Sequence, residues 1–188
     1  MSSAYNNAVL ASEGMENVYV LDSKNLSTGI ALLCIRGREM ATSGNAPKDI
    51  YAELENLVNK VRSSFVIEKL NYLHKGGRCS ALTLLGANVL KIKPQIAVKD
   101  GRIGVNRKYV GGMNKVVSKY IDELMEEYTN PNLDYVFITH SSEMPECQSI
   151  LKEKLLARGF KNIYDTYAGG TITSHCGPNT IGVLFIDN

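Results

Sequence analysis

The segment that most constrains the fold is residues 73–94, LHKGGRCSALTLLGANVLKIKP, in which a glycine turn leads into an apolar helix. Gly76 and Gly77 can adopt positive φ and allow another backbone to approach closely. The helix that begins near Ala81 is apolar around most of its circumference, which indicates burial on more than one side. We therefore expect it to lie under a sheet or to line a cavity.

This turn has two possible roles. Cys79 or Ser80 can cap the helix, and Arg78 is then expected to lie beside free backbone amides. Free N–H groups at a helix N-terminus, next to a guanidinium, form a possible anion site. A Gly-Gly pair before a helix is also common as a plain turn, so both interpretations stay open.

Length and charge exclude several classes of protein. The chain has 188 residues, enough for one large or two small domains, and 21 Lys and Arg against 19 Asp and Glu. This balance gives no electrostatic signature of nucleic-acid or anionic-membrane binding. Because no apolar run approaches the roughly 20 residues of a membrane span and no leader pattern follows Met1, a soluble cytoplasmic protein is expected.

The first third of the chain has the pattern of alternating helices and strands. A helix is predicted over residues 2–11, and NVYVL at 17–21 is typical of a buried parallel strand. Residues 27–40 are predicted to form a helix. Asn45 is expected to cap the next helix, with Pro47 in its first turn.

The pattern changes after residue 63. Asp100-Gly101 between two alternating runs predicts a β-hairpin, and an amphipathic helix is expected from Met113. Ser141 or Ser142 is expected to cap a later helix, which ends at Arg158. The other expected segments are strands at 65–67, 133–139, 161–167 and 181–186, and a loop at 171–179 that precedes the last of these strands.

The histidines are the first candidates for chemistry. His74, His140 and His175 each stand alone, without a carboxylate at a useful spacing in the sequence. His175 is the best placed of the three, because a loop just before a core strand can aim a side chain at a ligand. A structural histidine and a ligand contact both remain possible. Its neighbour Cys176 is expected to serve in packing, since adjacent residues in extended backbone point to opposite faces.

Other catalytic signatures are missing from the sequence. It contains neither G-x-G-x-x-G nor a P-loop motif, and its aspartates are dispersed, so no nucleotide, metal or cofactor is expected. The four cysteines lie far apart, which indicates reduced thiols and neither a zinc site nor a disulfide framework. The chain is predicted not to be an enzyme.

Several motifs in a fixed order resemble the DegV family of bacterial fatty-acid-binding proteins. They are SSAYNNA, VYVLDSKNLSTG, LNYLHKGGRCS, LGANVLKIKPQI, DGRIGVNRKY and TITSHCGPNTIGVLF. The resemblance implies two α/β domains that hold one long acyl chain in an apolar slot. It also implies that hydroxyl and histidine groups near the domain junction bind the carboxylate, which is presented to a separate fatty-acid kinase.

The resemblance assigns roles to individual residues. Ser2 corresponds to the serine of the family's L-S-G-T-Y motif, with Ser3 at the glycine of that motif, so this serine pair is the carboxylate candidate. His175 corresponds to the histidine of H-x-G-P-G. Gly77-Arg78 corresponds to the G-G-R turn, with Gly76 beside it as a possible anion or loop contact.

The chain departs from the family pattern at two places. It begins at the serine motif, so residues 1–62 are expected to be the remnant of a Rossmann-like N-terminal domain and residues 63–188 an α/β C-terminal domain with a mixed or antiparallel sheet. The remnant is expected to expose apolar surface and to self-associate. Val110 stands where many relatives have an arginine implicated in docking the kinase.

Two alternatives remain open at this stage. One is an enzyme or binding module for a phosphorylated small metabolite, which depends on an anion site at Gly76-Gly77-Arg78. The other is a truncated fragment without a ligand.

Overall fold

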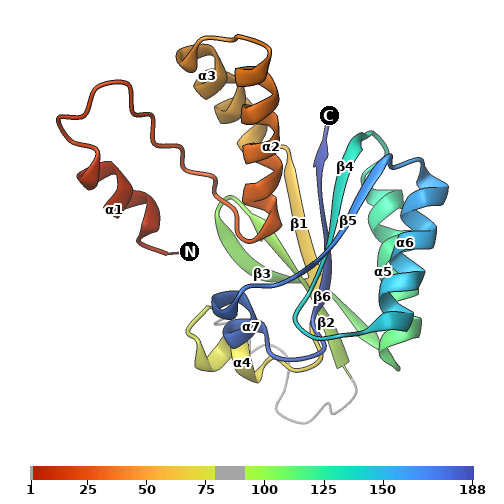
Figure 1. Ribbon diagram of the computed structural model, residues 1–188. Coiled ribbons are helices and arrows are strands. Elements are labelled where there is room, and N and C mark those ends of the chain that lie inside the picture. The colour runs from red at the N-terminus through yellow and green to blue at the C-terminus, as the bar shows by residue number, and fades with distance from the viewer. Residues whose placement is uncertain (1, 79–91) are drawn as a thin grey trace.

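A computed structural model describes residues 2–78 and 92–188 of the chain (Figure 1). The elements in chain order are α1 (Ala4–Ala11), α2 (Thr28–Thr42), α3 (Pro47–Val58), β1 (Val61–Val66), α4 (Asn71–Lys75), β2 (Ile92–Lys99), β3 (Arg102–Val110), α5 (Met113–Glu127), β4 (Pro131–His140), α6 (Pro145–Arg158), β5 (Asn162–Tyr167), α7 (Gly170–Cys176) and β6 (Ile181–Asp187).

The described strands form one mixed sheet of six strands in the order β3-β2-β1-β6-β4-β5. The β4–β5 pair is parallel, and every other neighbouring pair is antiparallel. The α/β fold class with a mixed sheet is confirmed. The expected boundary between residues 62 and 63 falls inside β1, and the division of a parent protein into two domains stays a prediction.

The predicted hairpin is present as β2 and β3. Asp100 has φ 51° and Gly101 has φ 72°, and two successive positive φ values are those of a type I′ turn, whose twist matches the strands that it joins. The register shifts between Gln95 and Ile96, and Asn106 on β3 is the extra, bulged residue.

Helices cover both faces of the sheet (Figure 1). Helices α5 and α6 pack on one face, where the largest core cluster includes Val117, Ile121, Leu151, Val183 and Phe185. On the other face, α2 and α3 form a second cluster with Phe137 and Leu184, and α4 and α7 form a third with Phe65 and Ile96. The sheet therefore separates one continuous core from two smaller ones.

The strand predicted at residues 17–21 is wrong. These residues have no strand partner in the part of the chain that the structure describes, and Val18 and Tyr19 are exposed. A β-branched run forms a strand only where another strand can take its backbone hydrogen bonds. Helix α1 is confirmed, but none of its residues is buried.

Two predicted helix caps are wrong as well. Ala46 precedes α3, and the Asn45 side chain instead donates to the carbonyl oxygen of Met40 at the end of α2. Met144 precedes α6, where its backbone N–H donates to Gln148 Oε1. In both helices proline occupies the first turn, and its missing N–H leaves one fewer donor for a side-chain cap to satisfy.

The loop predicted at 171–179 is also wrong in its first half, because Gly170–Cys176 forms α7. The apolar helix expected from Ala81 lies outside the described residues, as do Cys79 and Ser80. The short helix α4 before the glycine turn was not predicted. Among the described residues, no helix is long and apolar enough to cross a membrane.

Candidate functional site

An apolar cleft lies between the start of α2, the centre of the sheet and α7. Its lining is Leu26, Ser27, Phe65, Thr139, His140, Ser141, Ala168, Ile172, Cys176, Thr180, Gly182 and Leu184. The free volume is about 20 Å³, close to the space for one water molecule, so a larger ligand requires the walls to separate. The cleft lies between the two smaller cores on this face of the sheet.

Hydroxyl groups hold α2 to the sheet beside this cleft. Thr28 Oγ1 lies 2.7 Å from Thr139 Oγ1, which lies 3.1 Å from Thr166 Oγ1. Ser27, immediately before α2, has φ 50°, an unfavourable value for a residue with a side chain. The tertiary structure must therefore hold this corner in place.

His140 lies at the end of β4 and is almost fully buried. Its Nε2 atom is 3.0 Å from Asp165 Oδ1 and 3.2 Å from Gln148 Nε2, and its Nδ1 atom is 2.9 Å from the carbonyl oxygen of Ser142. The Tyr167 ring meets the imidazole at a centroid distance of 4.5 Å. No carboxylate stands close to His140 in the sequence, and the parallel pairing of β4 with β5 supplies Asp165 from a distant part of the chain.

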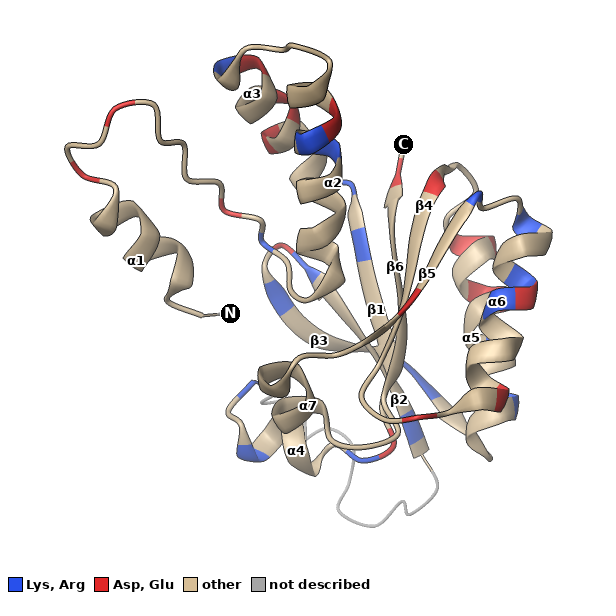
Figure 2. Ribbon diagram, in the orientation of Figure 1, with Lys and Arg blue, Asp and Glu red and all other residues tan. Residues whose placement is uncertain are grey.

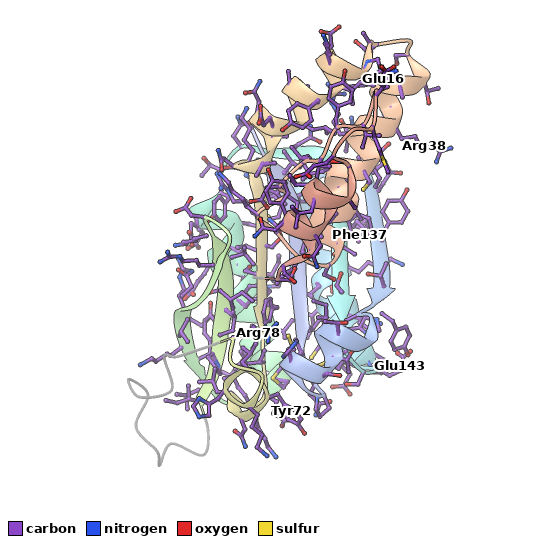
Figure 3. The ribbon with its side chains drawn as sticks, turned by 90° about the vertical axis from the view of Figure 1, so that its left-hand side faces the viewer. Glu16, Arg38, Tyr72, Arg78, Phe137 and Glu143 are labelled. Carbon is purple, nitrogen blue, oxygen red and sulfur yellow. The ribbon has the colours of Figure 1, made fainter. Side chains whose placement is uncertain are left out.

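The predicted ligand contact His175 lies on α7, where it packs on the turn after α4. A Cβ atom added at Gly76 would lie 2.1 Å from His175 Nδ1, and one added at Gly177 would lie 2.3 Å from the ring of Tyr72. Glycine is required at both positions for α4 and α7 to approach each other this closely. The structure therefore brings His175 together with the Gly76-Gly77-Arg78 turn. Figure 3 shows Tyr72 and Arg78 at this corner of the molecule.

The backbone amides of this turn are already engaged. The N–H groups of Gly76, Gly77 and Arg78 donate to the carbonyl oxygens of Tyr72, His74 and Leu73. The guanidinium of Arg78 donates to the Gly76 carbonyl oxygen at 2.8 Å. The amides of these three residues continue the hydrogen bonding of α4, and the free amides expected at the start of the helix near Ala81 lie outside the described residues.

The serine pair lies in another place. Ser2 Oγ accepts the Ala4 backbone N–H at 3.3 Å, and Ser3 is exposed at the start of α1. Ser2 lines a broad cavity of about 590 Å³ between α1, the extended segment near Asp22 and the β2–β3 turn at Gly101. No hydrogen bond within the described part of the chain joins Ser2 or Ser3 to His175.

Cys176 is a packing residue, as expected. It lies in the core cluster between α4 and α7, and burial raises the pKa of its thiol to about 11. A thiol with this pKa is protonated at neutral pH and is a poor nucleophile.

The sequence interpretation missed Thr139, Ser141 and Thr180 on the cleft wall. Ser141 Oγ donates to the Gly177 carbonyl oxygen and accepts the Thr180 N–H, so these residues tie the end of β4 to the start of β6. The polar run after the apolar part of β4 was the available signal, but it was interpreted as a helix cap.

Comparison with known proteins gives the family. A family model described as "Uncharacterised protein, DegV family" matches residues 1–188. A protein named "Fatty acid-binding protein" from Thermotoga maritima is 30% identical over 187 residues, which cover 97% of this chain and 64% of that protein. A DegV domain-containing protein from Clostridium perfringens is 28% identical and covers 99% of this chain. The chain spans 66% of the length of that relative.

Solved structures have the same fold. A DegV lipid binding protein from Thermotoga maritima superimposes with a TM-score of 0.85 and 27% identity, covering 99% of this chain and 65% of that one. A structure described as fatty acid binding of a DegV family protein from Thermus thermophilus has a TM-score of 0.87 and 25% identity, covering 100% of this chain and 67% of that one. With the family model matched from the first residue to the last, the chain belongs to the DegV family.

Proposed function

We propose that this chain takes part in binding a long-chain fatty acid, and that the cleft between α2 and α7 receives the acyl tail. The observation that carries the proposal is the composition of that cleft, whose walls include Leu26, Phe65, Ile172 and Leu184. The names of the relatives from Thermotoga maritima and Thermus thermophilus support it.

The affinity would come mainly from the tail. Burial of one methylene contributes about 0.8 kcal/mol, so a long acyl chain offers on the order of 10 kcal/mol before the costs of association are subtracted. Because the free volume of the cleft is only about 20 Å³, part of this free energy is needed to move α7 away from the start of α2.

The carboxylate is proposed to bind Ser2, Ser3 and His175, which requires α1, a helix without buried residues, to bring the serine pair to His175. Hydroxyl and imidazole groups bind a carboxylate less firmly than a bidentate arginine, which suits a ligand that must remain available for transfer. In this proposal the chain is a cytoplasmic carrier that presents the carboxylate to a fatty-acid kinase and performs no chemistry itself.

Extraction of the purified protein followed by mass spectrometry tests the ligand class. Co-purified C16 to C18 fatty acids are the expected result. A protein that carries no acyl chain and shows no affinity for palmitate in calorimetry would contradict the proposal. Saturable binding of inorganic phosphate at the turn after α4 would favour the phosphorylated-metabolite alternative.

A pair of histidine variants tests the head group. His175→Ala is expected to weaken palmitate binding about tenfold, the effect of one hydrogen bond to a charged group. His74→Ala is the matched control, because His74 is exposed on α4 next to the same turn. Equal affinities of the two variants would remove His175 from the proposed site.

A further inference from the structure

The sheet opens between β1 and β2. The two strands pair at Ser64↔Ala97, Phe65↔Ile96 and Val66↔Gln95, and the pairing then stops. Continuing the register would pair Ser63 with Val98 and Arg62 with Lys99, yet β1 continues along β6 and β2 continues along β3. Figure 1 shows the hairpin curving away from β1 at this end of the sheet.

A cavity of about 260 Å³ occupies this opening. Residues from both faces of the sheet line it, among them Asn25 and Val58 on the α2 side and Leu124 and Tyr128 on the α5 side. The bulged residue Asn106 also lines it, which is consistent with the frequent occurrence of bulges beside binding sites. The volume lies just below the usual range of ligand pockets, so an occupant must be small.

Two donors on the cavity wall have no acceptor among the described residues, and one of them, Arg62 Nε, is fully buried. Arg62 Nη1 donates to the Asn59 carbonyl oxygen at 2.9 Å and Nη2 lies 3.5 Å from Asp187, but the buried Nε atom has no hydrogen-bond partner. Gln95 is 1% exposed. Its Oε1 atom lies 3.3 Å from the Tyr109 hydroxyl, which donates to Glu123 at 2.8 Å, and its amide nitrogen has no acceptor among the described residues. A buried donor without an acceptor costs free energy, so the wall is suited to a ligand that brings oxygen atoms.

The charged side chains around the cavity also favour a ligand with negatively charged oxygen atoms. Among the described residues, Lys24 and Lys99 line the cavity and form no ion pair, and Lys99 Nζ donates only to the neutral Asn106 side chain. Glu127 also lines the cavity, but its carboxylate binds Arg107 at 2.9 Å. Figure 2 shows basic positions on both β1 and the hairpin. Asp100 lines the cavity as well and forms no ion pair among the described residues, so two lysines and one carboxylate are unpaired and the net uncompensated charge is positive.

We propose that the opening between β1 and β2 binds a small oxyanion, a carboxylate or phosphate group carried by a small molecule, with Arg62 Nε–H and the Gln95 amide as its donors. Val58 and Leu124 give the site an apolar part, which favours a short organic acid over an inorganic ion. This site is separate from the proposed fatty-acid cleft, with which it shares no lining residue.

Nuclear magnetic resonance tests the site in the chain as it stands. Glutarate and inorganic phosphate are titrated separately while the Arg62 Nε–H and Gln95 side-chain amide signals are followed. Saturable shifts of both signals are expected with at least one probe, and the probe that gives them identifies the source of the oxyanion. The absence of saturable shifts with both probes up to about 20 mM, a concentration well above weak millimolar affinity, would overturn the proposal.

Variants distinguish binding at this site from non-specific electrostatic attraction of the probe to the protein. Arg62→Lys removes the Nε donor and keeps the charge, and Gln95→Met removes the amide in a side chain of similar size. Each should weaken binding of the effective probe about tenfold, with the thermal midpoint of unfolding measured alongside. Arg38→Lys, at an exposed position on α2, is the matched control and should bind as the wild type does. Equal binding by all three variants would show that the donors play no part and would contradict the assignment.

Discussion

Gly182 in the central strand β6 has no room for a side chain. A Cβ atom there would lie 2.5 Å from Phe65 Cβ and 2.5 Å from the Ser64 backbone oxygen on β1. Because backbone cannot move aside easily, Gly182→Ala is expected to lower the free energy of unfolding by about 2 kcal/mol. Gly104→Ala is the control, since nothing lies within 4 Å of its added Cβ atom. Denaturant unfolding of the two variants measures the difference, and equal stabilities would contradict the steric argument.

Glu68 gives a prediction about pH. Its carboxylate accepts the Asn179 side-chain amide at 2.7 Å and lies 3.4 Å from Lys93 Nζ. Asn179 first, and Lys93 with it, hold the pKa of Glu68 below its ordinary value of 4.5. A carboxyl group whose pKa is lower in the folded state stabilises the fold above its unfolded pKa, and this contribution is lost as the pH falls through the folded pKa.

Glu68→Gln is therefore expected to lower the free energy of unfolding by about 1 kcal/mol at pH 7, the scale of one intramolecular hydrogen bond. The difference between variant and wild type should shrink below pH 4.5, where the wild-type carboxyl becomes protonated. Unfolding curves at pH 7 and at pH 3 measure both quantities. A difference that stays constant with pH would show that the carboxylate charge has no part in the effect.

The N-terminal elements differ from the sheet in how they are held. Helix α1 contains no buried residue, whereas α2 buries Leu32 and Leu33 against the sheet. Local opening requires little free energy where few apolar contacts must be broken. Amide hydrogen exchange should therefore be faster over residues 1–62 than over 63–188, and fastest before α2. Uniform protection along the chain, together with a monomer in light scattering, would contradict this expectation and the proposed self-association.

At the scale of the whole molecule, the surface around β3 bears on the proposed kinase partner. Val110 ends this edge strand and is 67% exposed. Valine cannot form the charge-assisted hydrogen bonds of the arginine that many relatives are expected to have there. The affinity for a fatty-acid kinase should therefore be lower in this chain by about 2 kcal/mol or more, which is at least tenfold.

Restoration of the arginine tests this expectation. Val110→Arg should raise the affinity for the kinase, measured by calorimetry or by acyl-phosphate formation, in a chain joined to the N-terminal segment of a relative. Lys108→Arg, two residues earlier on the same strand, is the control, because it adds a guanidinium group to β3 at another position. If wild type and Val110→Arg bind the kinase equally, Val110 is an ordinary surface residue.

Local sequence determined the elements whose signals come from adjacent residues. Asp100-Gly101 was sufficient to predict the hairpin, because the turn needs two positive φ values. The spacing of the apolar residues in α5 predicted which side of that helix is buried. Motifs in a fixed order were sufficient to identify the family, and the match over residues 1–188 confirms that identification.

Tertiary structure decided the features that depend on distant partners. The NVYVL run at 17–21 has strand propensity, but strand formation requires a neighbour to take its hydrogen bonds. Asp165 reaches His140 only because β4 and β5 lie parallel. The cavity at Arg62 exists because the pairing of β1 with β2 begins only at Ser64 and leaves Arg62 and Ser63 without a partner on β2. Each of these features depends on which strands become adjacent, and no stretch of local sequence contains that information.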